Sequence, residues 1–440
     1  MQVINFIHQL KLEDIPEAIQ REGIRSLIDT LGAAIIGHNT KLSHIVNEYV
    51  VATYGGKGGF LWLDGREVSL PAAVFANGMT TDAMGIYGGH PLARGTAGAT
   101  LLATLLTTVT PNATGKELLT SWIMGFEIAF RAGIALNKRD SSKAHTACTW
   151  NIIGSAAIAS RLLSLSPSQT EHALGIAEYV APVAPIPKTV GYPTMVRTGA
   201  GWAAMEGVTS ALLARQGFTG SPTFNIEEKE VADIWDDLGQ HWQLSKSYYK
   251  PYTVCRWMQA GMDAALVLRD HLKEDFKSIT SIKVHSFAVA TKERNMPMPK
   301  NTEEAQFNLK FAVAAILVYG ELGRATTFEA AFKSDIVAHL YDCIETIEEE
   351  KFTSIYPNQR FARVIIKTYS GMTYDSGDIE EKWASTEPPT DEELKEKFRA
   401  LTKGELSEKR ATDLEEMVWN CISLSNVSSL LELMNQPNLS

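Results

Sequence analysis

Apolar residues recur at helical spacing over about the first 235 residues, and this pattern constrains the fold more than any other feature of the chain. One face of a helix that begins after Pro16 and ends near Gly37 carries six of them: Ile19, Ile24, Leu27, Ile28, Leu31 and Ile35. The segment 97–109 is apolar almost all round, as expected for a helix enclosed by other helices. Further helices are predicted at 72–84, 115–136, 149–165, 167–176 and 201–217. The first half of the chain is therefore predicted to form a helical domain.

The pattern changes after about residue 275, where apolar and polar residues alternate. Strands are predicted at 281–290 and 362–368, and a hairpin turn at 369–374 leads into a third strand. Helical segments are expected around 304–319 and 328–349. Two more are expected near the end of the chain, one at 391–402 behind a capping box of Thr390 and Glu393 and one at 414–433.

These elements predict a mainly α fold with an α+β lid, in which a large all-helical domain is joined to a smaller α+β domain. The helical domain is expected to span 1–270 and to be completed by 405–440, and the α+β lid domain is expected to span 271–404. A chain of 440 residues exceeds the size at which a single core stops growing, so two domains are the default. The boundary between them is expected to provide the cleft.

Charge and cysteine content exclude several classes of function. The chain has 41 basic and 51 acidic residues and a formal net charge of −10, which argues against binding to nucleic acid or to anionic membranes. Its four cysteines lie far apart with no C-x-x-C pair, so neither a zinc site nor a disulfide framework is indicated. The N-terminus lacks the pattern of a signal or transit peptide, and the longest apolar stretches fall short of the roughly 20 residues that span a bilayer. A cytoplasmic protein is expected.

The chain carries no nucleotide-binding fingerprint, no H-E-x-x-H zinc motif and no G-x-S-x-G nucleophile motif. Chemistry must then come from acid, base and charge stabilisation by side chains, which directs attention to histidines near glycines and basic residues. The first such segment is the glycine-rich loop before the helix at 97–109. Gly88 and Gly89 would let the backbone approach a ligand closely, beside His90, and the amides that open the helix near Thr96 could hold a carboxylate. The alternative is a loop that only connects two helices.

Two further segments bring histidine and cations together. Lys143 precedes His145 just ahead of an apolar helix, where the cations nearby would lower the pKa of the imidazole and attract an acidic substrate. Arg197, Lys250 and Arg256 each lie near the start of a buried helix, where arginine can grip a carboxylate with two hydrogen bonds and lysine acts as a compact charge. The alternatives are a histidine that caps or packs at the helix start and cations that are solvated at the surface.

Assembled in order, these segments resemble the MmgE/PrpD family, whose members include 2-methylcitrate dehydratase, cis-aconitate decarboxylase and iminodisuccinate epimerase. The resemblance runs nearly end to end. It rests on nine stretches: PEAIQREGIRSLIDTLGAAIIG, AVFANGM, GGHPLARGTAGA, ELLTSWIMGFEIAFR, HTACTWNIIGSAAIASRLLSLSPSQTEHALGIA, MVRTGAGWAAMEGVTSALLARQGFTG, KPYTVCRWMQAGMDAAL, AQFNLKFAVA and DEELKEKFRALT.

The resemblance implies a helical domain with a smaller α+β lid, a homodimer, and chemistry without cofactor or metal at a carbon next to a carboxylate. His145 matches the family's catalytic histidine, Lys250 its active-site lysine and His90 the histidine of the first loop, while Arg197 stands where many relatives have lysine. The first loop departs from the family. Gly85 and Gly88 occupy positions where relatives carry acidic residues, and Thr96 replaces a second histidine.

The function that follows is a lyase that decarboxylates or dehydrates a small di- or tricarboxylic acid. The predicted catalytic residues are His145, which would move the proton, with Lys250 and His90; the predicted substrate-binding residues are Arg197, Arg256, Lys143 and Thr96. An epimerase would use the same histidine to lift and return an α-proton. A carboxylate-binding relative without catalysis is the alternative from another class, because a glycine cannot replace a carboxylate that relays a proton.

Overall fold

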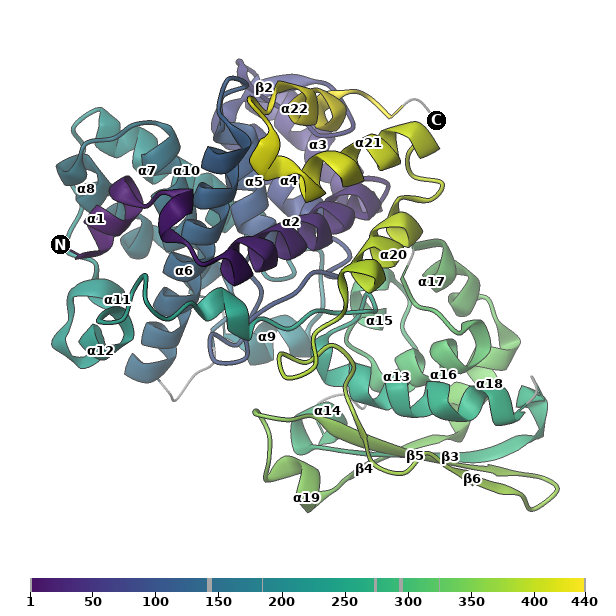
Figure 1. The fold of residues 1–440 in the computed structure, drawn as a ribbon. Helices are drawn as coiled ribbons and strands as arrows, with labels where there is room; N and C mark the ends of the chain where they lie inside the picture. Colours follow the sequence, from purple (N-terminus) through teal and green to yellow (C-terminus); the bar gives the residue numbers. More distant parts are fainter. Residues whose placement is uncertain are drawn as a thin grey trace.

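The protein is described by a computed structural model that covers residues 2–140, 145–183, 185–272, 275–292, 296–323 and 325–438. It is mainly helical with one small mixed sheet, which confirms the predicted fold class. Figure 1 shows the first helices and the C-terminal helices gathered in one body, and the sheet with its covering helices in a second, smaller one.

The larger body is built from helices and one short hairpin. Its helices in the first part of the chain are α1 (Gln2–Gln9), α2 (Glu17–His38), α3 (Lys41–Thr53), α4 (Leu70–Asp82), α5 (Gly98–Thr108), α6 (Gly115–Arg139), α7 (Cys148–Leu162), α8 (Pro167–Val180), α9 (Ile186–Gly191), α10 (Ala200–Arg215), α11 (Phe224–Glu227) and α12 (Ala232–Trp235). The hairpin pairs β1 (Gly58–Phe60) with β2 (Glu67–Ser69). These bounds confirm all the helices that periodicity predicts in this half.

Helix α6 is the longest in the described chain, and it is apolar and long enough to cross a membrane. However, 94% of its most apolar window is buried within the protein, where α6 packs against α7 and α5. The sequence expectation that no apolar stretch reaches this length is therefore wrong for α6. The length of α6 is explained by the core that it crosses, which also takes residues from α2, α8 and α10.

The smaller body surrounds a mixed sheet in the order β4-β3-β5-β6, with β7 also paired to β5. Its strands are β3 (Ile279–Ser286), β4 (Ile344–Glu348), β5 (Phe361–Thr368), β6 (Thr373–Asp375) and β7 (Ile379–Glu380). Strand β3 runs parallel to β4 and antiparallel to β5. The helices of this part are α13 (Arg256–Arg269), α14 (Ala288–Thr291), α15 (Thr302–Ala305), α16 (Leu309–Tyr319), α17 (Ala325–Phe332), α18 (Asp335–Cys343) and α19 (Glu350–Thr353).

Three sequence expectations in this part need correction. The strand predicted at 281–290 ends at Ser286, and Ala288–Thr291 form α14. The helix predicted at 328–349 is broken between Phe332 and Asp335 and ends at Cys343. The next residues form β4, in which three of the five residues are β-branched and which pairs in parallel with β3. The helix predicted at 304–319 is broken between Ala305 and Leu309, where the Asn308 side chain caps α16 by accepting a hydrogen bond from the Phe311 backbone N–H. The predicted hairpin is confirmed, with Gly371 at a φ of 82° in the turn before β6.

The chain returns to the larger body through α20 (Asp391–Thr402), α21 (Glu408–Trp419) and α22 (Ser428–Asn435). Helix α20 begins at the predicted capping box and packs on α2, while α13 packs with α16 and β5 in the second core. The domain limits at 270/271 and 404/405 stay predictions. What matters for the site is that the second core also includes Ile86 and Tyr87 of the glycine-rich loop.

Candidate active site

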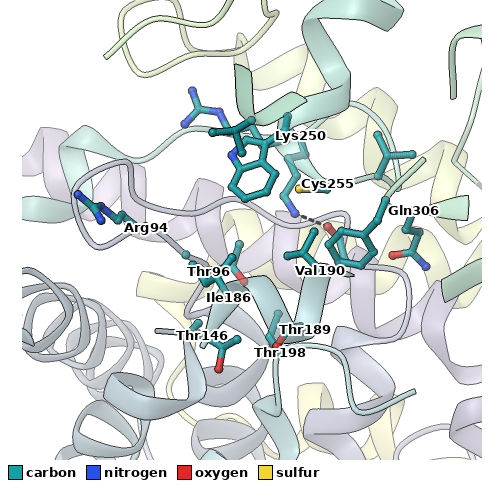
Figure 2. A pocket seen from close by; sticks show the side chains of 18 of the residues that line it. Arg94, Thr96, Thr146, Ile186, Thr189, Val190, Thr198, Lys250, Cys255 and Gln306 are labelled. Carbon is teal, nitrogen blue, oxygen red and sulfur yellow. Dashed lines mark hydrogen bonds between the residues drawn. The ribbon is translucent and has the colours of Figure 1, made fainter. Parts of the chain in front are cut away.

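A cavity of about 390 Å³ lies where the two cores meet. One part of its wall comes from the loop after α4, the start of α7, α9 and the segment before α10; the other comes from residues 248–257, α14, residues 306–307 and the segment before β5. Figure 2 shows these side chains converging from separate parts of the chain. The predicted cleft between the two parts of the fold is therefore present.

The glycine-rich loop is packed too tightly for side chains at two of its positions. Gly85 has a φ of 57°, and a Cβ there would lie 2.4 Å from Nη2 of Arg197. A Cβ on Gly88 would lie 2.4 Å from the carbonyl oxygen of Tyr248. The backbone of Gly89 exchanges two hydrogen bonds with Tyr248, at 3.0 and 2.9 Å. Glycine is thus required because the loop lies directly on the segment that carries Lys250.

A buried ion pair between Lys397 and Asp29 binds the backbone of this loop. Nζ of Lys397 in α20 donates hydrogen bonds to Asp29 of α2 and to the carbonyl oxygen of Ile86. The other carboxylate oxygen of Asp29 accepts a hydrogen bond from the Gly88 backbone N–H at 2.8 Å. Because both side chains are buried and fully used, the pair fixes the loop between α2 and the cavity.

His90 lines the cavity, yet its ring is fully buried and packs on Phe130 at 4.7 Å between ring centroids. Its Nδ1 accepts a hydrogen bond from the Ala93 backbone N–H at 3.2 Å, which leaves the ring proton on Nε2. Burial lowers the pKa of His90 to about 3, with a smaller contribution from the charge of Lys246. His90 is therefore a neutral imidazole at neutral pH, and its contacts with Ala93 and Phe130 stabilise the loop.

Lys250 is the most perturbed cation on the wall. Its Nζ donates a hydrogen bond to the carbonyl oxygen of Gly85, which Figure 2 marks with a dashed line. Burial lowers the pKa of Lys250 to about 8; the positive charge of Arg197 lowers it further, while Cys255 and Asp82 oppose the shift. Such an amine is mainly protonated at neutral pH, but it can exchange a proton readily.

Arg197 lies beside Lys250 and has a φ of 52°, so its backbone is strained to bring the side chain into the cavity. Its Nη1 donates to Oε1 of Gln306 at 2.5 Å, and its Nε lies 3.6 Å from Oδ2 of Asp82. Asp82 is buried at the end of α4 and accepts hydrogen bonds from the Tyr87 hydroxyl at 2.7 Å and from the Thr198 hydroxyl at 2.8 Å. These donors hold the carboxylate in place next to the two cations.

A second group of charges comes from the smaller body. Arg256 and Arg360 both contact Glu381, and the Arg256 guanidinium stacks on the ring of Tyr248 at 3.5 Å from its centroid. Nη1 of Arg256 and Nε of Arg360 are buried without a hydrogen-bond partner within the described part of the chain. Two arginines that share one carboxylate leave a net positive charge beside the cavity, which both residues line.

Of the other predicted site residues, some line the cavity and some do not. Thr96 lines the cavity, as does the more exposed Arg94, whereas Lys143 lies outside the described residues. His145 is not among the lining residues, although Thr146 and Ala147 are. Its ring is buried with Nε2 at 3.3 Å from Oδ2 of Asp140. The structure thus brings Arg197, Lys250 and Arg256 to one cavity, whereas His145 is not among the residues that line it.

Three functional candidates escaped the sequence interpretation: Asp82, Gln306 and Arg360. Asp82 lies in the segment that was singled out for its glycines and histidine, and Gln306 lies in one of the stretches of the family resemblance, so both could have been found there. Arg360 stands directly before a predicted strand and gives no signal of its own. No group of three or more His, Cys, Asp or Glu side chains close enough to hold a metal ion occurs among the described residues.

Comparison with known proteins gives matches over almost the whole chain. The MmgE/PrpD N-terminal domain matches residues 1–234, and the MmgE/PrpD C-terminal domain matches residues 252–421. A cis-aconitate decarboxylase-like protein of Aspergillus oryzae is 24% identical, with 99% of this chain and 96% of the relative covered. The cis-aconitate decarboxylase of Homo sapiens is 24% identical, with 98% of this chain and 93% of the relative covered, and that of Mus musculus is 23% identical, with 98% and 92% covered.

Proposed function

Because this chain belongs to the MmgE/PrpD family, we propose that it is a lyase that acts on a small di- or tricarboxylic acid. The reaction is decarboxylation of a cis-aconitate-like acid or dehydration of a 2-methylcitrate-like or other alkylcitrate-like acid. The names of the Aspergillus, human and mouse relatives support decarboxylation, and their coverage of nearly the whole chain supports a common site.

The observation that carries the proposal is the excess of positive charge on the cavity wall. Among the described residues, five cations line the cavity: Arg94, Arg197, Lys250, Arg256 and Arg360. Within the described part of the chain, the carboxylates that contact these cations are Asp82 on the wall and Glu381 behind it. The cations therefore exceed the carboxylates by three, one of them the exposed Arg94. A substrate with two or three carboxylates would supply the missing negative charge. Without such a partner, burial of the cations is very unfavourable.

The same charges suit the chemistry. In a decarboxylation the electron pair of the broken C–C bond stays on carbon, and in a dehydration the α-proton leaves its electron pair there; both place negative charge beside a carboxylate. Fixed cations in an enclosed cavity stabilise that charge better than water does. Lys250 is the best placed group to move the proton, because its pKa of about 8 lies near neutrality.

This assignment changes the role expected of the histidines. His90 carries no proton to donate from Nδ1 and remains neutral, and the ring of His145 lies off the cavity wall. We therefore assign proton transfer to Lys250, substrate carboxylate binding to Arg197 and Arg256 with Arg360, and hydrogen bonding to substrate oxygens to Thr96. No cofactor is proposed.

The test is incubation of the purified protein with cis-aconitate and with 2-methylcitrate, while released CO2 and alkene absorbance are followed. Turnover of either acid that falls by at least a hundredfold in Lys250→Met is the expected result, since general acid–base groups contribute roughly that much. Lys409→Met, at a lysine that is exposed on α21, is the matched control and should leave turnover unchanged.

Two outcomes decide against the proposal. Binding of these acids without turnover by the unaltered protein would favour the carboxylate-binding relative, and exchange of the α-hydrogen with solvent deuterium without a leaving group would favour the epimerase. The homodimer implied by the resemblance is proposed as the working form, and sedimentation of the purified protein tests it.

A further inference from the structure

The side chain of Tyr248 lies on the cavity wall, two residues before Lys250. Tyr248 is 6% exposed, and its hydroxyl group makes no hydrogen bond with any residue in the described part of the chain. We propose that Tyr248 is a further catalytic residue, whose hydroxyl group touches the bound acid and donates the proton that completes the reaction. The proposal rests on the proposed function, because it adds a proton donor beside Lys250 at the same site.

The backbone around Tyr248 explains why its side chain shares the cavity with Lys250. Tyr248 pairs with Gly89 in an antiparallel bridge, and in an extended segment alternate side chains point to the same side. Tyr248 and Lys250 both line the cavity, whereas Tyr249 between them donates a hydrogen bond to Glu22 at 2.5 Å and is not part of the wall. The alternation therefore places the phenol and the amine on one face of one segment.

Contacts at both ends of the ring fix the position of the hydroxyl group. The Arg256 guanidinium stacks on the ring at 3.5 Å from its centroid. A Cβ on Gly89 would lie 2.6 Å from the Tyr248 Oη and 2.9 Å from Cγ2 of Thr96, so the glycine leaves room for the hydroxyl group beside a lining residue. Among the described residues, the polar atoms that are buried without a partner include none from Tyr248. Its unpaired hydroxyl group is therefore accessible from the cavity that the residue lines.

The environment of the ring suits a proton donor. Burial raises the pKa of Tyr248, so the phenol keeps its proton at neutral pH and can donate it. The positive charges of Arg256 and Arg360 oppose this shift, because they stabilise the phenolate that remains after donation. A protonated phenol thus stands next to the cations to which we assign the binding of substrate carboxylates.

Both proposed reactions balance with Tyr248 as the acid. In a decarboxylation the C–C bond breaks, CO2 leaves, and the electron pair left on carbon takes the phenol proton. In a dehydration the Lys250 amine takes the α-proton, the C–O bond breaks, and the leaving hydroxide takes the phenol proton to become water. The phenolate then regains a proton from the Lys250 ammonium group through water in the cavity. After a decarboxylation, Lys250 takes a new proton from solvent.

The variant Tyr248→Phe removes the hydroxyl group and keeps the ring on which Arg256 stacks. Because no hydrogen bond to the described chain is lost, the melting temperature should change little. In the assay with cis-aconitate and 2-methylcitrate, kcat for the acid that is turned over should fall by at least about a hundredfold, while KM changes by less than about threefold. Tyr249→Phe is the matched control. It loses the contact with Glu22 and should lower the melting temperature, but should keep kcat within about threefold.

The double variant Lys250→Met/Tyr248→Phe tests whether the two residues serve one proton path. Residues that act as a unit are not additive, so the double variant should lose little more kcat than the more damaged single variant. A residue that only packs on the wall would instead add its own loss to that of Lys250→Met. Additive losses would therefore contradict the proposed path.

The outcomes distinguish this inference from the proposed function. If an acid is turned over and Tyr248→Phe keeps its kcat, the inference is wrong and the lyase proposal stands. If the unaltered protein turns over neither acid, the lyase proposal fails, and calorimetry with tricarballylate, a saturated tricarboxylic acid, still tests the contact. An affinity that falls by about tenfold in Tyr248→Phe would support a hydrogen bond from the phenol to the bound acid, and an unchanged affinity would overturn it.

Discussion

Lys250 should leave a signature in the pH dependence of stability that is independent of any substrate. Replacing it by methionine removes an amine that is buried in the cavity wall and keeps a side chain of similar length. The folded protein binds the Lys250 proton with a pKa of about 8, whereas the unfolded chain binds it with the ordinary value of 10.5. The two states therefore hold different numbers of protons between these values.

The sign follows from this difference. Below about pH 8 both states are protonated, and the folded state carries the full cost of a buried ammonium group. As the pH rises from about 8 to 10.5, the folded state loses the proton first, so stability increases with pH. A shift from 10.5 to about 8 corresponds to about 3 kcal/mol at about 1.4 kcal/mol per pKa unit.

The assay is urea unfolding followed by far-ultraviolet circular dichroism, for the unaltered protein and for Lys250→Met, at several values from about pH 7 to about pH 11. The unaltered protein should gain about 3 kcal/mol relative to the variant across this range. Other titrating groups are common to both proteins and cancel in the difference. The lost hydrogen bond to the Gly85 carbonyl shifts the whole curve of the variant but not its slope.

Lys409→Met again serves as the control, because the exposed Lys409 should give a difference that does not change with pH. A difference between Lys250→Met and the unaltered protein that stays constant from about pH 7 to about pH 11 would refute the reasoning. It would mean that Lys250 is solvated in the folded protein, and the proposed proton transfer at neutral pH would lose its basis.

Three further changes test the remaining geometry. Gly88→Ala places a Cβ 2.4 Å from the Tyr248 carbonyl oxygen and should lower the free energy of unfolding by about 1–3 kcal/mol, whereas Gly323→Ala, with no atom within 4 Å, should have little effect; equal effects would contradict the close packing of the loop. Asp82→Asn removes a negative charge that raises the pKa of Lys250, so the pH profile of kcat/KM should move to lower pH, and an unmoved profile would count against the contact. His145→Ala should lower turnover less than Lys250→Met does, because the ring lies off the cavity wall; an equal loss would restore the histidine as the proton carrier.

The helices of the first half could be predicted because their periodicity is local and strong. The bounds of α2 and α6, and the capping boxes of α8 and α20, follow from residues within each helix. Strand β4 was missed although three of its five residues are β-branched, because it is short and directly follows α18; its partner β3 lies about 60 positions earlier in the chain. The point where α18 ends and β4 begins is therefore set by the pairing with β3 and not by local sequence alone.

In the candidate site too, some features could be predicted from local sequence and others depend on how the chain folds. Arg197, Lys250 and Arg256 were found because each lies near the start of a buried helix, where a cation can bind a carboxylate, and the fold brings all three to one cavity. The position of His145 depends on how the chain turns into α7: the next two residues face the cavity and the histidine does not. A difference of one residue in that turn has no counterpart in composition or spacing, so only the structure could show it.

The glycines of the first loop also look different once their surroundings are known. From the sequence, Gly85 and Gly88 suggest a site that has lost acidic groups and left nothing in their place. In the structure the space beyond Gly85 is filled by the Arg197 guanidinium, and the space beyond Gly88 is filled by the main chain at Tyr248. A carboxylate is still present beside Arg197 and Lys250, but it is supplied by Asp82 at the end of α4.

This rearrangement bears on whether the site has been weakened or rebuilt. A weakened site would be expected to lose the contacts that hold the glycine-rich loop and Arg197 in place. Here Asp82 accepts hydrogen bonds from Tyr87 and Thr198, Arg197 is held by Gln306, and Lys397 with Asp29 fixes the loop that permits the approach of Arg197. A side chain at Gly85 would displace the Arg197 guanidinium from these contacts. These contacts favour a loop that has been rebuilt around Arg197 over one that has only lost its acidic groups.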